Sequence, residues 1–207
     1  MDAWLEQPGY PVVTAEVVDD TLVLSQKQFF IGEAVDKNLL PIPLNSNWQG
    51  LPETLTEARL EIPNYSQLAM QNEGALRLNT ENTAHYITNY KGELLNAVLE
   101  QLIELDTVSK LQVIQERRLL AESGEISYAE LVPLLTKLAD ETSYLVAEAI
   151  SQVVEGLDVF LTEGSQAQAQ FKALVSHLMQ KNYDRLGFEP QADESDEDEW
   201  FVKIRFH

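Results

Sequence analysis

The chain has 207 residues, is 44% hydrophobic and contains no cysteine. Its formal net charge of −20 repels polyanions, which argues against a nucleic-acid partner and against binding to an anionic membrane surface. A basic or neutral partner is favoured instead. Without cysteine the chain has no disulfide framework, no thiolate nucleophile and no cysteine metal cluster, which fits a reducing compartment.

The N-terminal residues 1–8 lack the basic start and the apolar core of a signal peptide. No run approaches the roughly 20 apolar residues that a membrane helix needs. Even the apolar segment from Tyr144 to Leu161 carries Glu148, Glu155 and Asp158. We therefore expect a soluble protein of the cytoplasm.

The chain up to residue 90 is predicted to consist of strands. Two β-rich runs, Pro11–Val18 and Thr21–Phe30, flank Asp19-Asp20 and predict a hairpin, because aspartate tolerates the left-handed backbone of a tight turn. Four further runs read as strands, the first at a sheet edge because of its prolines: Leu39–Leu44, Thr56–Pro63, Leu76–Leu78 and Tyr86–Thr88. With no helical stretch between them, they predict a small antiparallel β-sandwich, with Trp4, Tyr10 and Trp48 in its core.

From Glu93 onward apolar residues recur every three or four positions, which is typical of amphipathic helices. Helix starts are predicted at Glu93, at the cap Asp106, at the Ser127-x-x-Glu130 capping box and near Ser143, and a fifth helix carries Phe171 to Met179. Ser123-Gly124, Gly164, and Gly187 with Pro190 are predicted helix ends. The predicted apolar faces include Val108, Leu145, Leu157, Phe160, Phe171 and Leu174.

These patterns predict two domains, a β-sandwich over residues 1–90 and an incomplete, HEAT-like helical array over residues 91–207. A helical array buries its apolar faces only between neighbours, so an unfinished array exposes one. We therefore predict a homodimer that forms through the exposed helices.

The sequence predicts no catalytic, cofactor-binding or metal-binding residue. His85, His177 and His207 lie too far apart to show metal-ligand spacing, and His177 is expected on a solvated helix face. Gly-rich phosphate loops and nucleophile elbows are absent.

Two charged runs allow a functional and a structural interpretation. Glu116-Arg117-Arg118 could present a cationic pair to a substrate carboxylate, but pairing with acidic neighbours is favoured. Asp193–Glu199 invites a calcium site, yet it lacks the alternating ligands and central glycine of an EF-hand loop. A solvated acidic loop explains this run better.

Three segments carry a family resemblance. Trp4–Val13 resembles the Trp-x-x-Gln-x-Gly-Tyr-Pro-Val-Val signature that opens the β-sandwich domain of the zinc aminopeptidase N family, in its lactic-acid-bacterial form. Tyr86, Asn89 and Tyr90 match the family's closing sandwich strand, although Ile87 stands where arginine is common. Arg185–Phe188 resembles a late segment of the helical domain.

The resemblance implies that this chain contributes no catalytic residues. Enzymes of this family remove N-terminal residues from peptides with zinc, and their zinc-binding and amine-binding motifs belong to upstream domains. The chain is thus expected to be a non-catalytic C-terminal part that supports and roofs the active-site chamber and is inactive alone. Its partners would be the upstream catalytic domains, with zinc and peptide substrates bound only in the full-length context. The alternative is a stand-alone helical module that binds peptides or proteins.

The tail after Glu199 departs from the family pattern, which continues as a helix of the type Glu-Leu/Met-Val-Arg-Gln. Here the chain reads Trp200-Phe201-Val202-Lys203. We expect a one-base shift of the reading frame to explain this difference.

Overall fold

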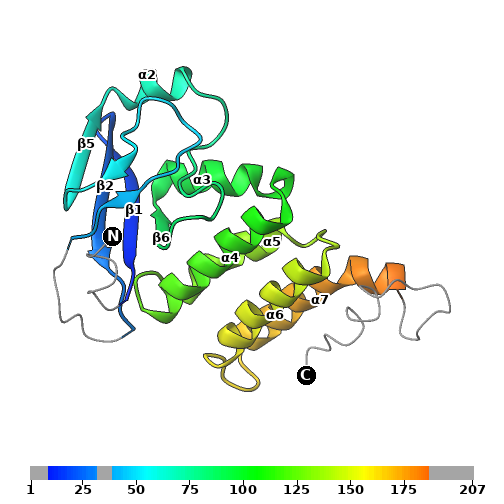
Figure 1. Cartoon of the computed structure of the whole chain (residues 1–207). Coiled ribbons are helices and arrows are strands. Elements are labelled where there is room, and N and C mark those ends of the chain that lie inside the picture. Colours follow the sequence, from blue (N-terminus) through cyan, green and yellow to red (C-terminus); the bar gives the residue numbers. More distant parts are fainter. Residues whose placement is uncertain (1–8, 32–38, 187–207) are drawn as a thin grey trace. The chain divides into compact units, whose positions relative to one another are not determined.

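The computed structural model describes residues 9–31 and 39–186, which form two compact units (Figure 1). Unit 1 holds the described residues up to Gln101 together with Leu119–Glu125, and unit 2 holds Leu102–Arg118 and the described residues from Ile126 onward. The combination of β and α structure is confirmed. Trp4, the acidic run Asp193–Glu199, the helix end at Gly187 and Pro190, and the tail after Glu199 lie outside the described residues.

Unit 1 is built on a four-stranded sheet in the order β5-β2-β1-β6. Its strands are β1 (Pro11–Val18), β2 (Thr21–Gln28), β5 (Arg59–Pro63) and β6 (Ile87–Tyr90). Strands β1 and β2 pair antiparallel up to Val18↔Thr21, so the predicted hairpin is confirmed. Asp19 and Asp20 have φ of 47° and 60°, the two left-handed residues that a type I′ turn requires.

The expectation of an entirely antiparallel arrangement is wrong at β6. This strand pairs parallel with β1, from Val12↔Ile87 to Ala15↔Tyr90. Parallel neighbours need a long crossover, which the residues between β2 and β6 provide. The expectation that no helix interrupts the strands is also wrong, because α2 (Tyr65–Met70) follows β5. The start of α2 is held by Asp20, whose carboxylate accepts hydrogen bonds from the Ser66 amide (2.7 Å) and hydroxyl (2.6 Å).

The predicted strand Leu76–Leu78 is wrong as well. Leu76 and Leu78 are buried, but no strand within the described residues pairs with their segment. Irregular backbone bonds, from the Asn47 amide to the Arg77 carbonyl (3.1 Å) and from the Asn79 amide to the Leu44 carbonyl (2.8 Å), act together with side chains in place of a ladder. The amide of Arg77 donates to Asn47 Oδ1 (2.7 Å), and the amide of Leu78 donates to Tyr90 Oη (2.7 Å). The buried polar backbone is thereby satisfied without a sheet.

A second, two-stranded ladder joins β3 (Ile42–Pro43) to β4 (Thr54–Leu55). Gln26 of β2, only 7% exposed, connects to this region through both ends of its amide. Its Nε2 donates to the carbonyls of Leu40 (3.0 Å), Leu55 (3.4 Å) and Glu57 (3.1 Å). Its Oε1 accepts from the Leu40 amide at 3.0 Å. One side chain therefore fixes two loops against the sheet.

Helix α3 (Gly92–Gln101) packs on β1 and buries Leu94, Val98 and Leu99. The apolar period predicts Leu95, Val98 and Leu99 on this face, so it is correct for Val98 and Leu99, whereas Leu94 is buried and Leu95 is only half-buried. Helix α4 (Thr107–Glu122) contributes to both units, because Leu119–Glu125 belongs to unit 1. It ends at Glu122, directly before the predicted helix end Ser123-Gly124: Gly124 has φ of 78°, and the Glu125 amide donates back to the Leu120 carbonyl (2.9 Å). Glu125 then forms an ion pair with Lys27 of β2.

Unit 2 is helical. Besides the first part of α4 it contains η1 (Leu102–Glu104), η2 (Tyr128–Leu131), α5 (Val132–Lys137), α6 (Tyr144–Asp158) and α7 (Gln166–Leu186). Figure 1 shows α6 beside α7, and these two helices are in contact. Two predicted caps are confirmed: Asp106 accepts from the amide and hydroxyl of Ser109, and Ser127 with Glu130 forms a capping box. The capping box opens a short 3-10 turn, from which α5 continues.

The apolar positions predicted after the Ser127 capping box are all buried: Leu131, Leu134, Leu135 and Leu138. The predicted faces of α4 and α6 are shifted, because Val108, Leu145 and Phe160 are exposed by 57%, 52% and 66%. In α6 the buried apolar residues are Val146, Ala149, Ile150, Val153 and Val154. The helix also ends at Asp158, before the predicted Gly164. Leu145 and Val146 are both apolar, so the spacing alone did not decide which of them faces inward.

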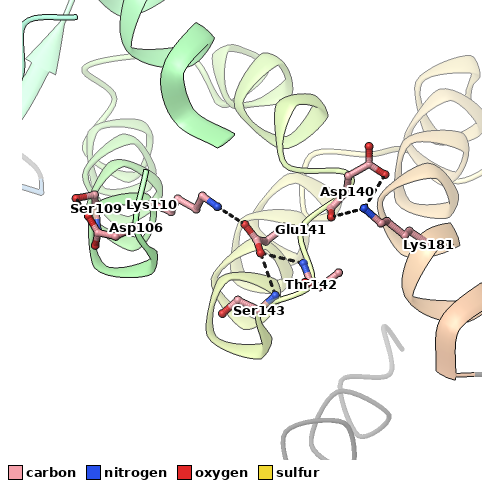
Figure 2. Close-up of polar contacts among 8 residues, drawn as sticks. All are labelled: Asp106, Ser109, Lys110, Asp140, Glu141, Thr142, Ser143 and Lys181. Carbon is pink, nitrogen blue, oxygen red and sulfur yellow. Dashed lines mark hydrogen bonds and ion pairs between the residues drawn. The ribbon is translucent and has the colours of Figure 1, made fainter. Parts of the chain in front are cut away.

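The link between α5 and α6 joins three helices of unit 2 (Figure 2). Glu141 forms an ion pair with Lys110 of α4 (2.7 Å), and both side chains are only 14% exposed. The other oxygen of Glu141 accepts from the amides of Thr142 (2.9 Å) and Ser143 (3.0 Å) at the start of α6. Its neighbour Asp140 pairs with Lys181 of α7, whose Nζ donates to the Asp140 carbonyl at 3.0 Å.

The electrostatics of Glu141 follow from these contacts. Burial opposes ionisation of its carboxyl, but the hydrogen bonds from Lys110, Ser143 and Thr142 and the charge of Lys110 outweigh it, so its pKa is lowered. A lowered pKa means that the folded state favours the carboxylate. The resulting stabilisation is complete above the ordinary glutamate pKa of about 4.3, and it is lost as the pH falls through the lowered value.

We predict that Gln26→Leu destabilises unit 1 by about 3 kcal/mol, because it leaves the buried amide and carbonyl of Leu40 without their hydrogen-bond partner. Urea unfolding followed by circular dichroism measures the change. The control is Gln67→Leu, the same substitution at an exposed position of α2. Equal stability of the two variants would contradict a role for the Gln26 amide.

We predict that Glu141→Gln lowers the stability of unit 2 by about 1 to 2 kcal/mol at pH 7, since it removes the charge that Lys110 faces. The difference from the unsubstituted chain should begin to shrink below about pH 4 and should close as the pH falls through the lowered pKa of the folded-state carboxyl. Urea unfolding at pH 7 and pH 3.5 tests both points. Glu155→Gln, at an exposed site of α6, should show no such difference, and a gap between Glu141→Gln and the native chain that is constant with pH would refute the assignment.

Candidate functional site

Within residues 9–31 and 39–186, no group of three or more histidine, aspartate, glutamate or cysteine side chains is placed to hold a metal ion. His85 is exposed and meets the ring of Tyr10 edge-on at 4.7 Å, and His177 is exposed on α7. His207 lies outside the described residues. In the described part of the chain, no helix is both long and apolar enough to cross a membrane.

The run Glu116-Arg117-Arg118 is placed so that Arg117 is turned inward. Arg117 is 3% exposed, and its Nη2 lies 3.5 Å from Glu130 Oε2. Burial lowers the pKa of Arg117, and the charge and hydrogen bond of Glu130 partly offset this effect. Glu130 belongs to η2, so the partner is on another element of unit 2, not on the same helix. Arg117 therefore connects α4 to η2 and is not presented to a substrate carboxylate.

The described part of unit 2 contains an apolar groove between η2, α6 and α7. It has a volume of about 570 Å³ and is lined mainly by Tyr128, Val132, Leu157, Phe160, Phe171 and Leu174. We call these residues the η2–α6–α7 groove. Four of them belong to the apolar faces that the sequence predicts, and the structure shows that they form an open surface.

Aromatic contacts shape this groove. The rings of Tyr128 and Phe160 lie 5.0 Å apart in a tilted arrangement, and Phe160 is 66% exposed. Gly156 lets the Tyr128 ring approach α6, because a Cβ at this glycine would lie 3.0 Å from Tyr128 Cε1. The ring of Tyr128 thus lies close against the backbone of α6. The sequence pattern does not predict this position of Tyr128, since its contacts Gly156 and Phe160 belong to another part of the chain.

Comparison with known proteins places the chain in a family. Residues 76–203 match the model of the ERAP1-like C-terminal domain. The chain is 63% identical over 201 residues to an aminopeptidase N of Lactococcus lactis subsp. lactis, and 41% identical over 199 residues to one of Lactobacillus delbrueckii subsp. lactis. Each alignment covers 96% of this chain and 24% of the relative.

A more distant relative is the tricorn protease-interacting factor F2 of Thermoplasma acidophilum, which is 25% identical over 158 residues. The chain spans about a quarter of the length of the bacterial relatives named above. The resemblance read from Trp4–Val13 and from the segment ending at Tyr90 is confirmed by these matches, and the chain belongs to the ERAP1-like C-terminal domain family as a C-terminal part of the aminopeptidase N type.

Proposed function

We propose that this chain is a non-catalytic C-terminal part of a zinc metallo-aminopeptidase that removes N-terminal residues from peptides. The observation that carries the proposal is the 63% identity to an aminopeptidase N over 96% of the chain but only 24% of the relative. Identity at that level over nearly the whole chain supports a shared role. The small share of the relative supports chemistry that resides in other parts of the enzyme.

In this proposal the chain works as a scaffold. Residues 1–90 form a β-sandwich and residues 91–207 begin a HEAT-like array that roofs the active-site chamber. The sheet of unit 1 and the helices of unit 2 supply the rigid elements that such a role needs. Zinc and peptide substrates are bound only together with the upstream catalytic domains, and the complex is cytoplasmic.

A second candidate function is a stand-alone module that binds peptides or proteins. The η2–α6–α7 groove favours it, because its lining is mostly apolar and Phe160 at its edge is exposed. The homodimer predicted from the sequence would also use exposed helices of this kind, and it stays a prediction.

We predict that the chain alone binds no stoichiometric zinc and hydrolyses none of a panel of aminoacyl-p-nitroanilides. Metal analysis by mass spectrometry after dialysis against zinc, followed by the absorbance assay, measures both quantities. The intact lactococcal aminopeptidase N serves as the positive control. One zinc per chain together with turnover would overturn the scaffold proposal.

We further predict that co-expression with the upstream part of the lactococcal aminopeptidase N raises the activity of that part at least tenfold. The physical reason is that a catalytic domain lacking its supporting domains leaves apolar surface exposed and loses its preorganised geometry. The Gln26→Leu variant, which weakens unit 1, is the matched control and should restore less activity. If the upstream part is unaffected while the chain still binds peptides, the stand-alone module is the better function.

A further inference from the structure

Large apolar side chains at and beside the η2–α6–α7 groove are exposed. Phe160 is 66% exposed, its neighbour Val159 is 80% exposed, and Val132 on the opposite element is 37% exposed. Contiguous exposed apolar side chains around a hollow are typical of binding surfaces. The volume of about 570 Å³ lies within the range of small-ligand and peptide pockets, about 300 to 1,000 Å³.

The charge around the groove indicates what it can bind. Between residues 127 and 174 the chain carries seven acidic and two basic residues, and three of the acidic ones, Glu130, Asp140 and Glu141, are paired with Arg117, Lys181 and Lys110. Glu155, Asp158 and Glu163 are all exposed, and Asp158 directly follows the groove residue Leu157. The charge of Lys172, beside Phe171, is the local exception. An apolar hollow in a negative field attracts ligands that combine apolar groups with positive charge.

The aromatic lining strengthens this selectivity. Tyr128, Phe160 and Phe171 line the groove, and aromatic rings attract ammonium and guanidinium groups as well as apolar side chains. A second copy of this chain fits less well, because two chains with a net charge of −20 repel each other. The groove therefore favours a cationic occupant over a copy of itself.

We propose that the η2–α6–α7 groove is a docking site for a peptide segment in which aromatic or aliphatic side chains are flanked by lysine or arginine. The apolar side chains enter the groove between α6 and α7, and the cations face Asp158 and Glu163. The site requires neither zinc nor an aminopeptidase activity, so it stands or falls separately from the scaffold role.

The test uses the full 207-residue chain and a fluorescein-labelled octapeptide of alternating phenylalanine and lysine. Fluorescence anisotropy measures the dissociation constant at about 50 and 200 mM salt. A second octapeptide has glutamate in place of lysine. We expect the lysine peptide to bind at least tenfold more tightly than the glutamate peptide, and its affinity to fall with salt because the charges are exposed.

Two pairs of variants locate the binding site. Phe160→Ala should weaken binding of the lysine peptide at least fivefold, whereas Ile103→Ala, a substitution of another exposed apolar residue of unit 2 outside the groove lining, should leave it unchanged. Asp158→Asn combined with Glu163→Gln should weaken binding about threefold and reduce its salt dependence. Circular dichroism confirms that each variant is folded.

The charge-matched control is Glu100→Gln combined with Glu104→Gln, which changes the net charge equally at two exposed residues that do not line the groove. If this control weakens binding as much as Asp158→Asn with Glu163→Gln, the affinity depends only on net charge and the proposal is wrong. Equal binding of both peptides, or unchanged binding to Phe160→Ala, would also overturn it. If light scattering shows a dimer that Phe160→Ala dissociates, the occupant is a second copy of the chain.

Discussion

Unit 1 depends on the need to satisfy buried backbone polar groups where strands are too short to do so. β3 and β4 are two residues long, and within the described residues no strand pairs with the segment around Leu78. Side chains therefore supplement the few backbone hydrogen bonds that these segments form. The side chain of Gln26 donates to the carbonyls of Leu40 and Leu55, and the hydroxyl of Tyr86 donates to the Leu44 carbonyl at 2.7 Å. The net contribution of each such hydrogen bond to stability is modest, but a buried polar group that loses its partner destabilises the fold by about 1 to 3 kcal/mol.

In unit 2, buried charged side chains likewise need hydrogen-bonding and ionic partners. Glu141 is held by Lys110 and by two helix amides, so its buried charge is both paired and hydrogen-bonded. Arg117 is more buried still and depends on Glu130, whose other oxygen completes the capping box with the Ser127 amide. A buried ion pair gives little net stability but strong geometric specificity when its partners are on different elements. The acidic excess of the chain thus coexists with a few cations placed at structural junctions.

The sequence predicted features whose cause is local. Asp19-Asp20, the cap Asp106 and the box from Ser127 act within a few residues of themselves, and each is found as expected. It did not predict features whose cause is distant. Nothing near Ile87 states that β6 pairs parallel with β1, and the helix α2 is held by a carboxylate 46 residues away. Several groove residues were recognised as apolar, but their assembly into an open surface depends on how α6 and α7 pack.

Helix α4 is shared between the two units of the chain. Its last residues and the loop to Glu125 belong to unit 1, where Glu125 pairs with Lys27, while its part up to Arg118 belongs to unit 2. A chimaera that transplants the sheet alone, cut at Tyr90, would leave behind α3 and the Leu119–Glu125 strip that completes unit 1. Unit 1 of this chain is therefore discontinuous in sequence, and a fusion that keeps unit 1 whole must carry Leu119–Glu125 together with the sheet.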